Sequence, residues 1–247
     1  MNGYGSGFFG LPPVVKNIIM INVLMLLAYF AAASVFDVNL NAMLGLYFPK
    51  SEHFMPMQIV THIFMHGGLW HLFFNMYALF IFGQILEASW GPKRFFIYYM
   101  VCGLGAALTH EIVIAVQYYN LAEILDPEQM QRVIEDGSAL FNEGKVFTNE
   151  HMKELQLLLN TPTVGASGAI FGILLAFGVL FPNTQLMLLI PPMPIKAKYF
   201  VLIYGAIELY LAVTQPGSNI AHAAHLGGML FGYLLIKYWR KTTHTLY

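Results

Sequence analysis

Hydrophobic residues along this chain gather into six runs, at residues 14–36, 68–87, 93–117, 166–181, 198–214 and 219–239. A helix needs roughly 20 apolar residues to cross the hydrocarbon core of a membrane, and most of these runs are near that length. Residues that interrupt helices separate the runs, as Gly91-Pro92, Pro182, Pro191-Pro192, Pro194 and Pro216-Gly217. The pattern predicts an all-α membrane protein in which six transmembrane helices form one domain, residues 1–247.

The composition agrees with a chain that lies mostly in lipid. Of its 247 residues, 57% are hydrophobic and only 10% are charged, and the net charge of −1 offers no basic surface for a nucleic acid. Cys102 is the single cysteine and lies in an apolar run, so the chain can form neither an internal disulfide nor a thiolate metal site. We expect the lipid bilayer as a partner, no nucleic-acid partner, no metal and no cofactor.

Positive charges predict the orientation in the membrane. With six spans both termini lie on one side, and most of the basic residues fall on that side, namely Lys16, Lys93, Arg94, Lys196, Lys198, Lys237, Arg240 and Lys241. The positive-inside rule then places both termini in the cytoplasm. Residues 1–13 lack the basic start and the cleavage site of a secretory signal, so we expect a flexible N-terminus before a retained anchor. A prokaryotic plasma membrane is the expected location.

The segment between the third and fourth runs, residues 118–164, is polar and carries most of the acidic residues. Asp126-Pro127 is typical of an N-cap followed by the first helical position, which predicts a short helix ending near Gly137. A second helix is expected to start at Asn149, and its apolar face comprises Met152, Leu155, Leu158 and Leu159. The two interfacial helices could dock a substrate or could simply cover the backbone of their own loop.

Ser167 belongs to a group of small residues, Gly165-Ala166-Ser167-Gly168, that opens the fourth run. This run is short, so its helix is expected to begin below the membrane surface, where non-helical backbone must be buried or line a water-filled cavity. Ser167 then lies in a wet pocket near the free N–H groups of a helix start. A glycine and serine surface for helix packing explains these residues equally well. The motif G-x-S-x-G is absent, because Ala169 replaces its last glycine.

Other polar residues are expected at the same depth. His71 and Asn75 lie near the start of the second run, and His222 and His225 lie near the start of the sixth. The second, fourth and sixth runs all begin on one side of the membrane, so these residues converge with Ser167. A serine with a histidine is the minimum set for a base-activated nucleophile, and polar residues in spans suggest function. His71 and Asn75 share a helix face and could donate hydrogen bonds to an oxyanion, although interhelical bonding and interface packing are alternatives.

Glycines permit a close approach of the fourth and sixth runs. Gly168-x-x-x-Gly172 and Gly228-x-x-x-Gly232 are small-residue spacings that let helices pack backbone to backbone. Such packing would bring Ser167 within hydrogen-bond reach of His225. The spacing is common in membrane bundles, so it permits this pairing and does not prove it.

Three segments resemble the signatures of rhomboid intramembrane serine proteases: His71-Leu72-Phe73-Phe74-Asn75, Gly165-Ala166-Ser167-Gly168 and Ala224-His225-Leu226-Gly227-Gly228. The resemblance covers residues 14–239 and implies a six-helix fold that cleaves peptide bonds in or near transmembrane helices of membrane-protein substrates. It implies a dyad of Ser167 as nucleophile and His225 as general base, without a catalytic acid. It also implies that His71, Asn75 and the N–H of Ser167 hold the oxyanion, that the site opens toward the extracytoplasmic side, and that the fifth helix admits substrate laterally.

The resemblance also implies supporting roles. The family's Ala-His-x-x-Gly spacing falls on Ala224, His225 and Gly228, which makes His225 the base and leaves His222 one turn upstream, lining the cavity. Gly165 and Gly168 flank the serine. Phe171 stands where the family often has a tyrosine beneath the histidine, so the aromatic surface is kept and any hydroxyl contact is lost.

Three alternatives remain open from the residues. Glu208 in the fifth run or Glu111 in the third could complete a triad, although interhelical hydrogen bonds explain both acids more simply. His62, His66 and His71 cluster with ligand-like spacing, which would suit a metal transporter. The third alternative is a rhomboid-like scaffold that binds membrane helices without cleaving them. Such a scaffold should lack the serine or the histidine, and this chain has both.

Overall fold

The computed structural model describes residues 10–187, 192–214 and 222–243. Within these ranges a helical segment occupies each of the six apolar runs: α1 (Pro13–Phe36), α4 to α5 (Leu69–Trp90), α6 (Pro92–Ile124), α9 (Ser167–Leu180), α10 (Ala197–Thr214) and α11 (His222–Thr243). By length and composition, α1, α4 to α5, α6 and α10 can each cross a membrane, and α9 is a shorter apolar helix. The predicted all-α membrane bundle is confirmed.

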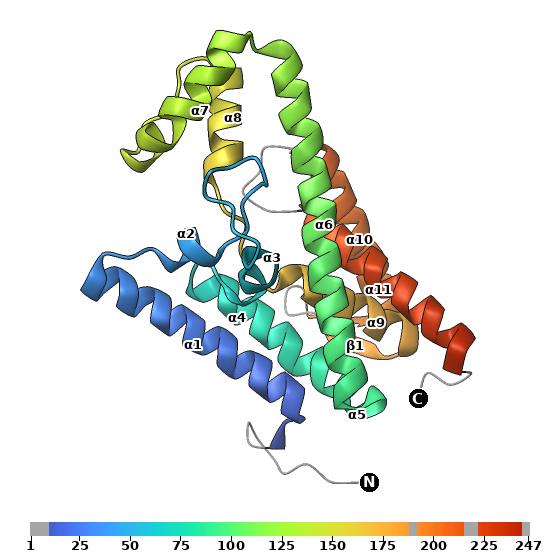
Figure 1. The fold of residues 1–247 in the computed structure, drawn as a ribbon. Helices are drawn as coiled ribbons and strands as arrows, with labels where there is room; N and C mark the ends of the chain where they lie inside the picture. Colours follow the sequence, from blue (N-terminus) through green and yellow to red (C-terminus); the bar gives the residue numbers. More distant parts are fainter. Residues whose placement is uncertain (1–9, 188–191, 215–221, 244–247) are drawn as a thin grey trace.

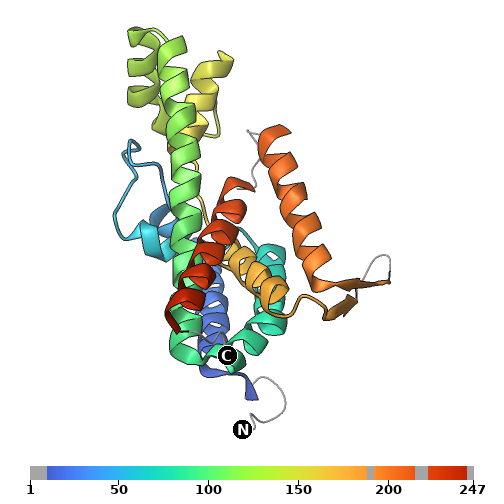
Figure 2. The same ribbon diagram turned by 90° about the vertical axis from the view of Figure 1, so that its right-hand side faces the viewer.

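The short helix α9 lies inside the bundle (Figure 2). Eleven of its 14 residues are buried, and α6, α9 and α11 pack most extensively against one another. The start of α1 and the end of α11 lie at one end of the molecule, whereas the helices of the 118–164 segment lie at the other (Figure 1). Both described ends of the chain are therefore on the same side, as expected for six crossings.

The outer faces of the bundle carry large apolar side chains. Phe74 on α4 is 63% exposed and Leu202 on α10 is 68% exposed, and α1 presents Leu24 in the same way. Such a surface would be unfavourable in water, but it costs nothing against lipid tails, which are equally apolar. The exposed faces are therefore the faces expected to contact the bilayer.

The second span is interrupted by a change of helix type. The α-helix α4 (Leu69–Ala78) passes into a π-helical turn, η3 (Leu79–Gly83), and continues as α5 (Gln84–Trp90). Gly83 lies in that turn, where an added Cβ would come within 3.1 Å of Val15 and 3.2 Å of Phe95. The missing side chain therefore lets the span approach α1 and α6.

Two helices fold over the segment 118–164, as predicted. Asp126 caps α7 (Pro127–Asn142) through a capping box with Gln129, and Asn149 caps α8 (Glu150–Asn160). The predicted end of α7 near Gly137 is wrong, because this glycine is buried against α8 and its carbonyl accepts a hydrogen bond from Gln156 Nε2 at 2.9 Å. Most of the predicted apolar face of α8, namely Met152, Leu155 and Leu159, is buried in a second core. The other side chains of this core include Leu121 of α6, Leu125 just after α6, and Val133 of α7. The helices thus cover their own unit, and α6 extends beyond residue 117 to support it.

The segment between α1 and α4 holds structure that the hydropathy pattern did not predict. It contains α2 (Leu40–Leu44), α3 (Gln58–Thr61) and the 3₁₀ turn η2 (His62–Phe64). The fully buried amide of Gln58 organises it: Nε2 donates to the carbonyls of Met43 and His53, and Oε1 accepts from the N–H of Met55. One buried polar side chain therefore ties three parts of this segment together.

A short antiparallel hairpin precedes α10 and was also not predicted. β1 (Gln185–Met187) pairs with β2 (Pro194–Lys196), with Leu186 opposite Ile195. The expected helix breakers Pro191 and Pro216-Gly217, and the first residues of the sixth run, lie outside the described residues. So does most of the expected flexible N-terminus, but its end is ordered, because Leu11 is buried in the main core.

Glu87 is a buried carboxylate, only 2% exposed, that the sequence analysis did not single out. Its two oxygens accept hydrogen bonds from the N–H groups of Val14 at 2.9 Å and Val15 at 2.8 Å. These groups belong to the first turn of α1, which has no helical partner for them, and the side chain of Pro12 at the N-cap cannot accept a hydrogen bond. Glu87 therefore caps α1 from α5 and ties the two helices together.

Replacing Glu87 by alanine is expected to lower the free energy of unfolding by about 1–3 kcal/mol, because two buried N–H groups lose their acceptors. The effect is measured as a fall of the thermal unfolding midpoint of purified protein in detergent. Glu87→Gln keeps one acceptor oxygen and is expected to lose less. Equal midpoints for the wild type and Glu87→Ala would show that the cap contributes nothing.

Candidate active site

An extended segment delivers the chain to Ser167, the first residue of α9. Thr163 and Leu46 exchange two backbone hydrogen bonds of 2.8 and 2.9 Å, and the N–H of Gly165 donates to the carbonyl of His62 at 3.0 Å. Gly165 has a φ of 136°, which favours glycine. The backbone before the helix is therefore paired, as a segment buried in a membrane bundle requires.

The structure brings Ser167 and His225 together. Ser167 Oγ lies 2.9 Å from His225 Nε2, although the residues come from α9 and α11 and are 58 positions apart. His225 is buried, whereas Ser167 is partly exposed. Close backbone packing permits this contact, because a Cβ on Gly228 would overlap the carbonyl oxygen of Gly168. The two predicted glycine surfaces thus meet at the level of the predicted nucleophile and base.

The ring of Phe171 lies flat against the ring of His225. Their centroids are 4.1 Å apart and their planes differ by 7°. Phe171 follows Ser167 by one turn on α9, so one helix supplies both the hydroxyl and the surface on which the imidazole rests. This stacking hinders the imidazole from tilting out of its plane, which preserves its contact with the serine.

His71 faces the same point as Ser167. A Cβ on Gly165 would lie 2.9 Å from His71 Nε2 and 3.6 Å from Ser167 Oγ. The N–H of Gly67 donates to His71 Nδ1 at 3.3 Å, and an imidazole that accepts at Nδ1 while neutral carries its hydrogen on Nε2. His71 therefore presents an N–H donor toward the space beside the serine hydroxyl.

Asn75 is buried one turn further along α4. One of its Nδ2 hydrogens goes to the carbonyl of His71 at 3.0 Å. No hydrogen bond among the described residues joins Asn75 directly to Ser167, so its predicted oxyanion role remains a prediction. The observed bond fixes the amide next to His71, with a second Nδ2 hydrogen free of that carbonyl.

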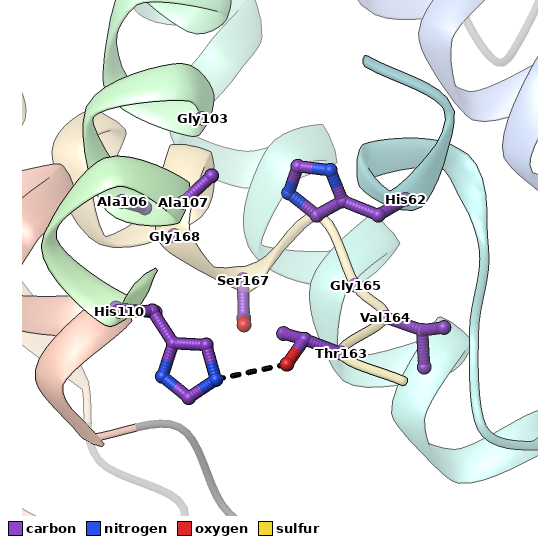
Figure 3. A pocket seen from close by; sticks show the side chains of 11 residues that line it. His62, Gly103, Ala106, Ala107, His110, Thr163, Val164, Gly165, Ser167 and Gly168 are labelled. Carbon is purple, nitrogen blue, oxygen red and sulfur yellow. Dashed lines mark hydrogen bonds between the residues drawn. The ribbon is translucent and has the colours of Figure 1, made fainter. Parts of the chain in front are cut away.

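A small cavity of about 30 Å³ lies beside Ser167 (Figure 3), large enough for a water molecule. Its wall includes Ser167, Gly165, Thr163, His62 and His110.

Two histidines in this wall have bonded rings. His110 Nε2 is bonded to Thr163 Oγ1 at 2.8 Å, a pair that the sequence analysis missed. The sequence feature that could have indicated this pair is His110 itself, a polar residue inside the third apolar run. Burial lowers the pKa of His62, so this ring is neutral and, with Nδ1 bonded to the Gln58 carbonyl, presents Nε2 as an acceptor.

Glu208 of α10 is bonded between helices, as the simpler explanation held, and one of its partners is the predicted base. Its Oε2 lies 2.7 Å from His222 Nδ1 and 2.9 Å from His225 Nδ1. His222 therefore binds Glu208, and it does not line the cavity beside Ser167. The other candidate acid, Glu111, has no hydrogen-bond partner among the described residues.

The same three residues form a group that could hold a metal ion. Ligand atoms of Glu208, His222 and His225 all lie within 4.8 Å of one another. In the part of the chain that the structure describes, the cluster expected for a transporter, His62, His66 and His71, forms no comparable set. Instead the rings of His66 and His71 contact edge to face at 5.0 Å.

Comparisons with known proteins agree with this architecture. The chain is 29% identical to the mitochondrial Rhomboid protein 1 of Saccharomyces cerevisiae over 178 residues. These residues cover 72% of the chain and 40% of that protein. It is 27% identical over 173 residues to the Rhomboid protease AarA of Providencia stuartii, covering 69% of the chain and 51% of the relative. The putative rhomboid protease YdcA of Bacillus subtilis is 25% identical over 180 residues, 72% of the chain and 64% of the relative.

The chain thus spans between about two fifths and two thirds of the length of these relatives. The model of the rhomboid domain family matches residues 53–242, from the loop before α4 to the end of α11. This range includes Ser167, His225, His71 and Asn75 and covers more than half of the chain. The protein is an integral membrane protein that belongs to the rhomboid family.

Proposed function

We propose that this protein is a serine endopeptidase that hydrolyses peptide bonds in or near the transmembrane helices of membrane-protein substrates. The observation that carries the proposal is the 2.9 Å contact between Ser167 Oγ and His225 Nε2 at the start of a helix inside a membrane bundle. A serine beside a histidine base is the arrangement that makes a hydroxyl nucleophilic. The relatives named as proteases support the same activity.

In the proposed reaction, Ser167 Oγ attacks the carbonyl carbon of the scissile bond while His225 Nε2 takes the hydroxyl proton. The negative charge that develops on the carbonyl oxygen receives hydrogen bonds from the N–H of Ser167 and from His71 Nε2, with Asn75 as a further donor. Protonated His225 then gives its proton to the leaving amine. A water molecule, activated by the same histidine, hydrolyses the acyl-enzyme, and the cavity beside Ser167 offers a place from which it can come.

We further propose a location in a prokaryotic plasma membrane with both termini in the cytoplasm and the site open to the extracytoplasmic side. Lys16 at the start of α1 and Arg240 and Lys241 at the end of α11 support this orientation, because they gather at one end of the bundle. The positive-inside rule assigns that end to the cytoplasm. α7 and α8 lie at the opposite end.

A fluorophosphonate probe tests the nucleophile without knowledge of the substrate. Purified protein in detergent is expected to be labelled at Ser167, because its hydroxyl lies 2.9 Å from Nε2 of the buried His225, which can remove its proton. Labelling is read by mass spectrometry of the digested protein. Ser89→Ala is a matched control, since that hydroxyl lies exposed on α5 and, among the described residues, bonds to the carbonyl of Ile85.

Ser167→Ala should lose the label, whereas Ser89→Ala should keep it. Labelling of Ser167→Ala at the wild-type level, or no labelling of folded wild-type protein, would contradict the proposed function.

A further inference from the structure

Glu208 is a carboxylate within the apolar stretch of α10 that follows Lys198. Its neighbours Ile207 and Leu209 are 46% and 57% exposed on the outer face of α10, whereas Glu208 is 5% exposed and faces α11. An acidic side chain within a membrane span is costly unless it is paired. The interactions of this carboxylate therefore indicate why the helix contains it.

Both partners of Glu208 are imidazole Nδ1 atoms. An ionised carboxylate can only accept hydrogen bonds, so His222 and His225 must both carry hydrogen on Nδ1 to form the bonds of 2.7 and 2.9 Å. With its hydrogen on Nδ1, neutral His225 has a lone pair on Nε2, the atom that faces Ser167 Oγ. The carboxylate thus selects the tautomer that a base for Ser167 requires.

The same helix also supports the face of the His225 ring. Tyr204 precedes Glu208 by one turn of α10, and its ring stacks on Phe171 with centroids 5.0 Å apart. Phe171 in turn stacks on His225. Contacts from α10 therefore reach the imidazole directly at Nδ1 and, through Phe171, at its flat side.

We propose that Glu208 is a positioning residue for His225, which makes the site a Ser167–His225–Glu208 triad completed from α10, with His222 holding the carboxylate. This inference rests on the proposed proteolytic function. The carboxylate fixes the tautomer and orientation of the ring and stabilises the imidazolium that forms when Ser167 loses its proton. Because Glu208 belongs to α10, displacement of α10 from α11 withdraws the carboxylate from the base.

The test compares two acids that lie in spanning helices. Glu208→Gln keeps the size of the side chain and removes its charge, and it is expected to lower kcat for cleavage of a transmembrane substrate by about 10- to 1,000-fold with little change of KM. The rate of fluorophosphonate labelling should fall in parallel. Glu111→Gln is the matched control, since the side-chain oxygens of Glu111 have no hydrogen-bond partner among the described residues, and it should keep the wild-type kcat.

Partial rescue distinguishes positioning from a general effect on folding. Glu208→Asp retains the charge on a shorter side chain and should be more active than Glu208→Gln at a similar unfolding midpoint. Nitrogen NMR of wild-type protein labelled at histidine gives a readout that needs no folded variant. Hydrogen on Nδ1 of His225 is expected, and hydrogen on Nε2 would overturn the proposal.

Several outcomes separate this inference from the proposed function. If the wild type cleaves, Ser167→Ala does not, and Glu208→Gln equals the wild type, the triad is wrong and the protease stands. If folded wild-type protein neither cleaves nor takes the probe, the proposed function itself fails. Stoichiometric zinc in purified protein, lost in Glu208→Gln, would show that the three residues form a metal site and would also overturn the triad.

Discussion

Replacing Ser167 by alanine is expected to reduce cleavage of a transmembrane substrate on the order of 10⁴-fold or more, which in practice abolishes it. The reason is that, in the proposed mechanism, the hydroxyl bonded to His225 Nε2 is the atom that attacks the scissile carbonyl. The assay follows cleavage, in detergent or in vesicles, of a membrane protein whose transmembrane helix contains helix-destabilising residues. Ser167→Ala should unfold at nearly the wild-type temperature, because the side chain makes one hydrogen bond and is partly exposed.

The activity of a double variant tests whether Ser167 and His225 work together. If Ser167 and His225 act as one unit, His225→Ala should lose nearly as much activity, and the double variant should be no worse than Ser167→Ala. Multiplicative losses would show that the two residues act independently. Full activity of Ser167→Ala would exclude Ser167 as the nucleophile.

The level of the site in the membrane could be predicted from the sequence because hydropathy alone orders the spans. The second, fourth and sixth runs begin on one side, and the fourth is short, so Ser167 and His225 had to lie at a similar depth. Small residues at Gly168 and Gly228 then indicated which helices approach closely, and their backbones do meet. The hydropathy runs and the spacing of small residues were sufficient to predict the depth of the site and the close approach of α9 and α11.

The partner of Glu208 could not be predicted in the same way. Its bond to His225 depends on how α10 is rotated about its axis against α11, and α10 is apolar on nearly all sides. An apolar helix in lipid has no polar face that reveals its rotation. The acid was visible in the sequence, but whether it faced a histidine, another acid or a backbone carbonyl required the packed structure.

The end of α7 and the cap of α1 could not be predicted from the sequence for a related reason. Gly137 was a reasonable end for α7, yet α7 continues because the bare backbone there allows Gln156 of α8 to reach its carbonyl. Glu87 lies in α5, but its carboxylate caps α1, more than 70 residues earlier in the chain. Long-range hydrogen bonds from single polar side chains leave no periodic signal.

Replacing Gly228 by alanine is expected to have the largest effect on folding. A Cβ at this position would overlap the carbonyl oxygen of Gly168 and lie 2.7 Å from its carbonyl carbon. Both atoms belong to the backbone of α9, so no flexible side chain can move aside, and α11 must shift away. The free energy of unfolding should fall by about 1–3 kcal/mol, or more, as measured by the unfolding midpoint in detergent.

Because α11 carries His225, the same shift should lengthen the contact with Ser167 and abolish cleavage and probe labelling in protein that remains folded. Gly205→Ala on α10 is the matched control, since its Cβ would meet only the flexible end of Met229, at 3.2 Å. It should keep both the midpoint and the labelling. If Gly228→Ala behaved like Gly205→Ala, the backbone contact between α9 and α11 could not be what holds the histidine against the serine.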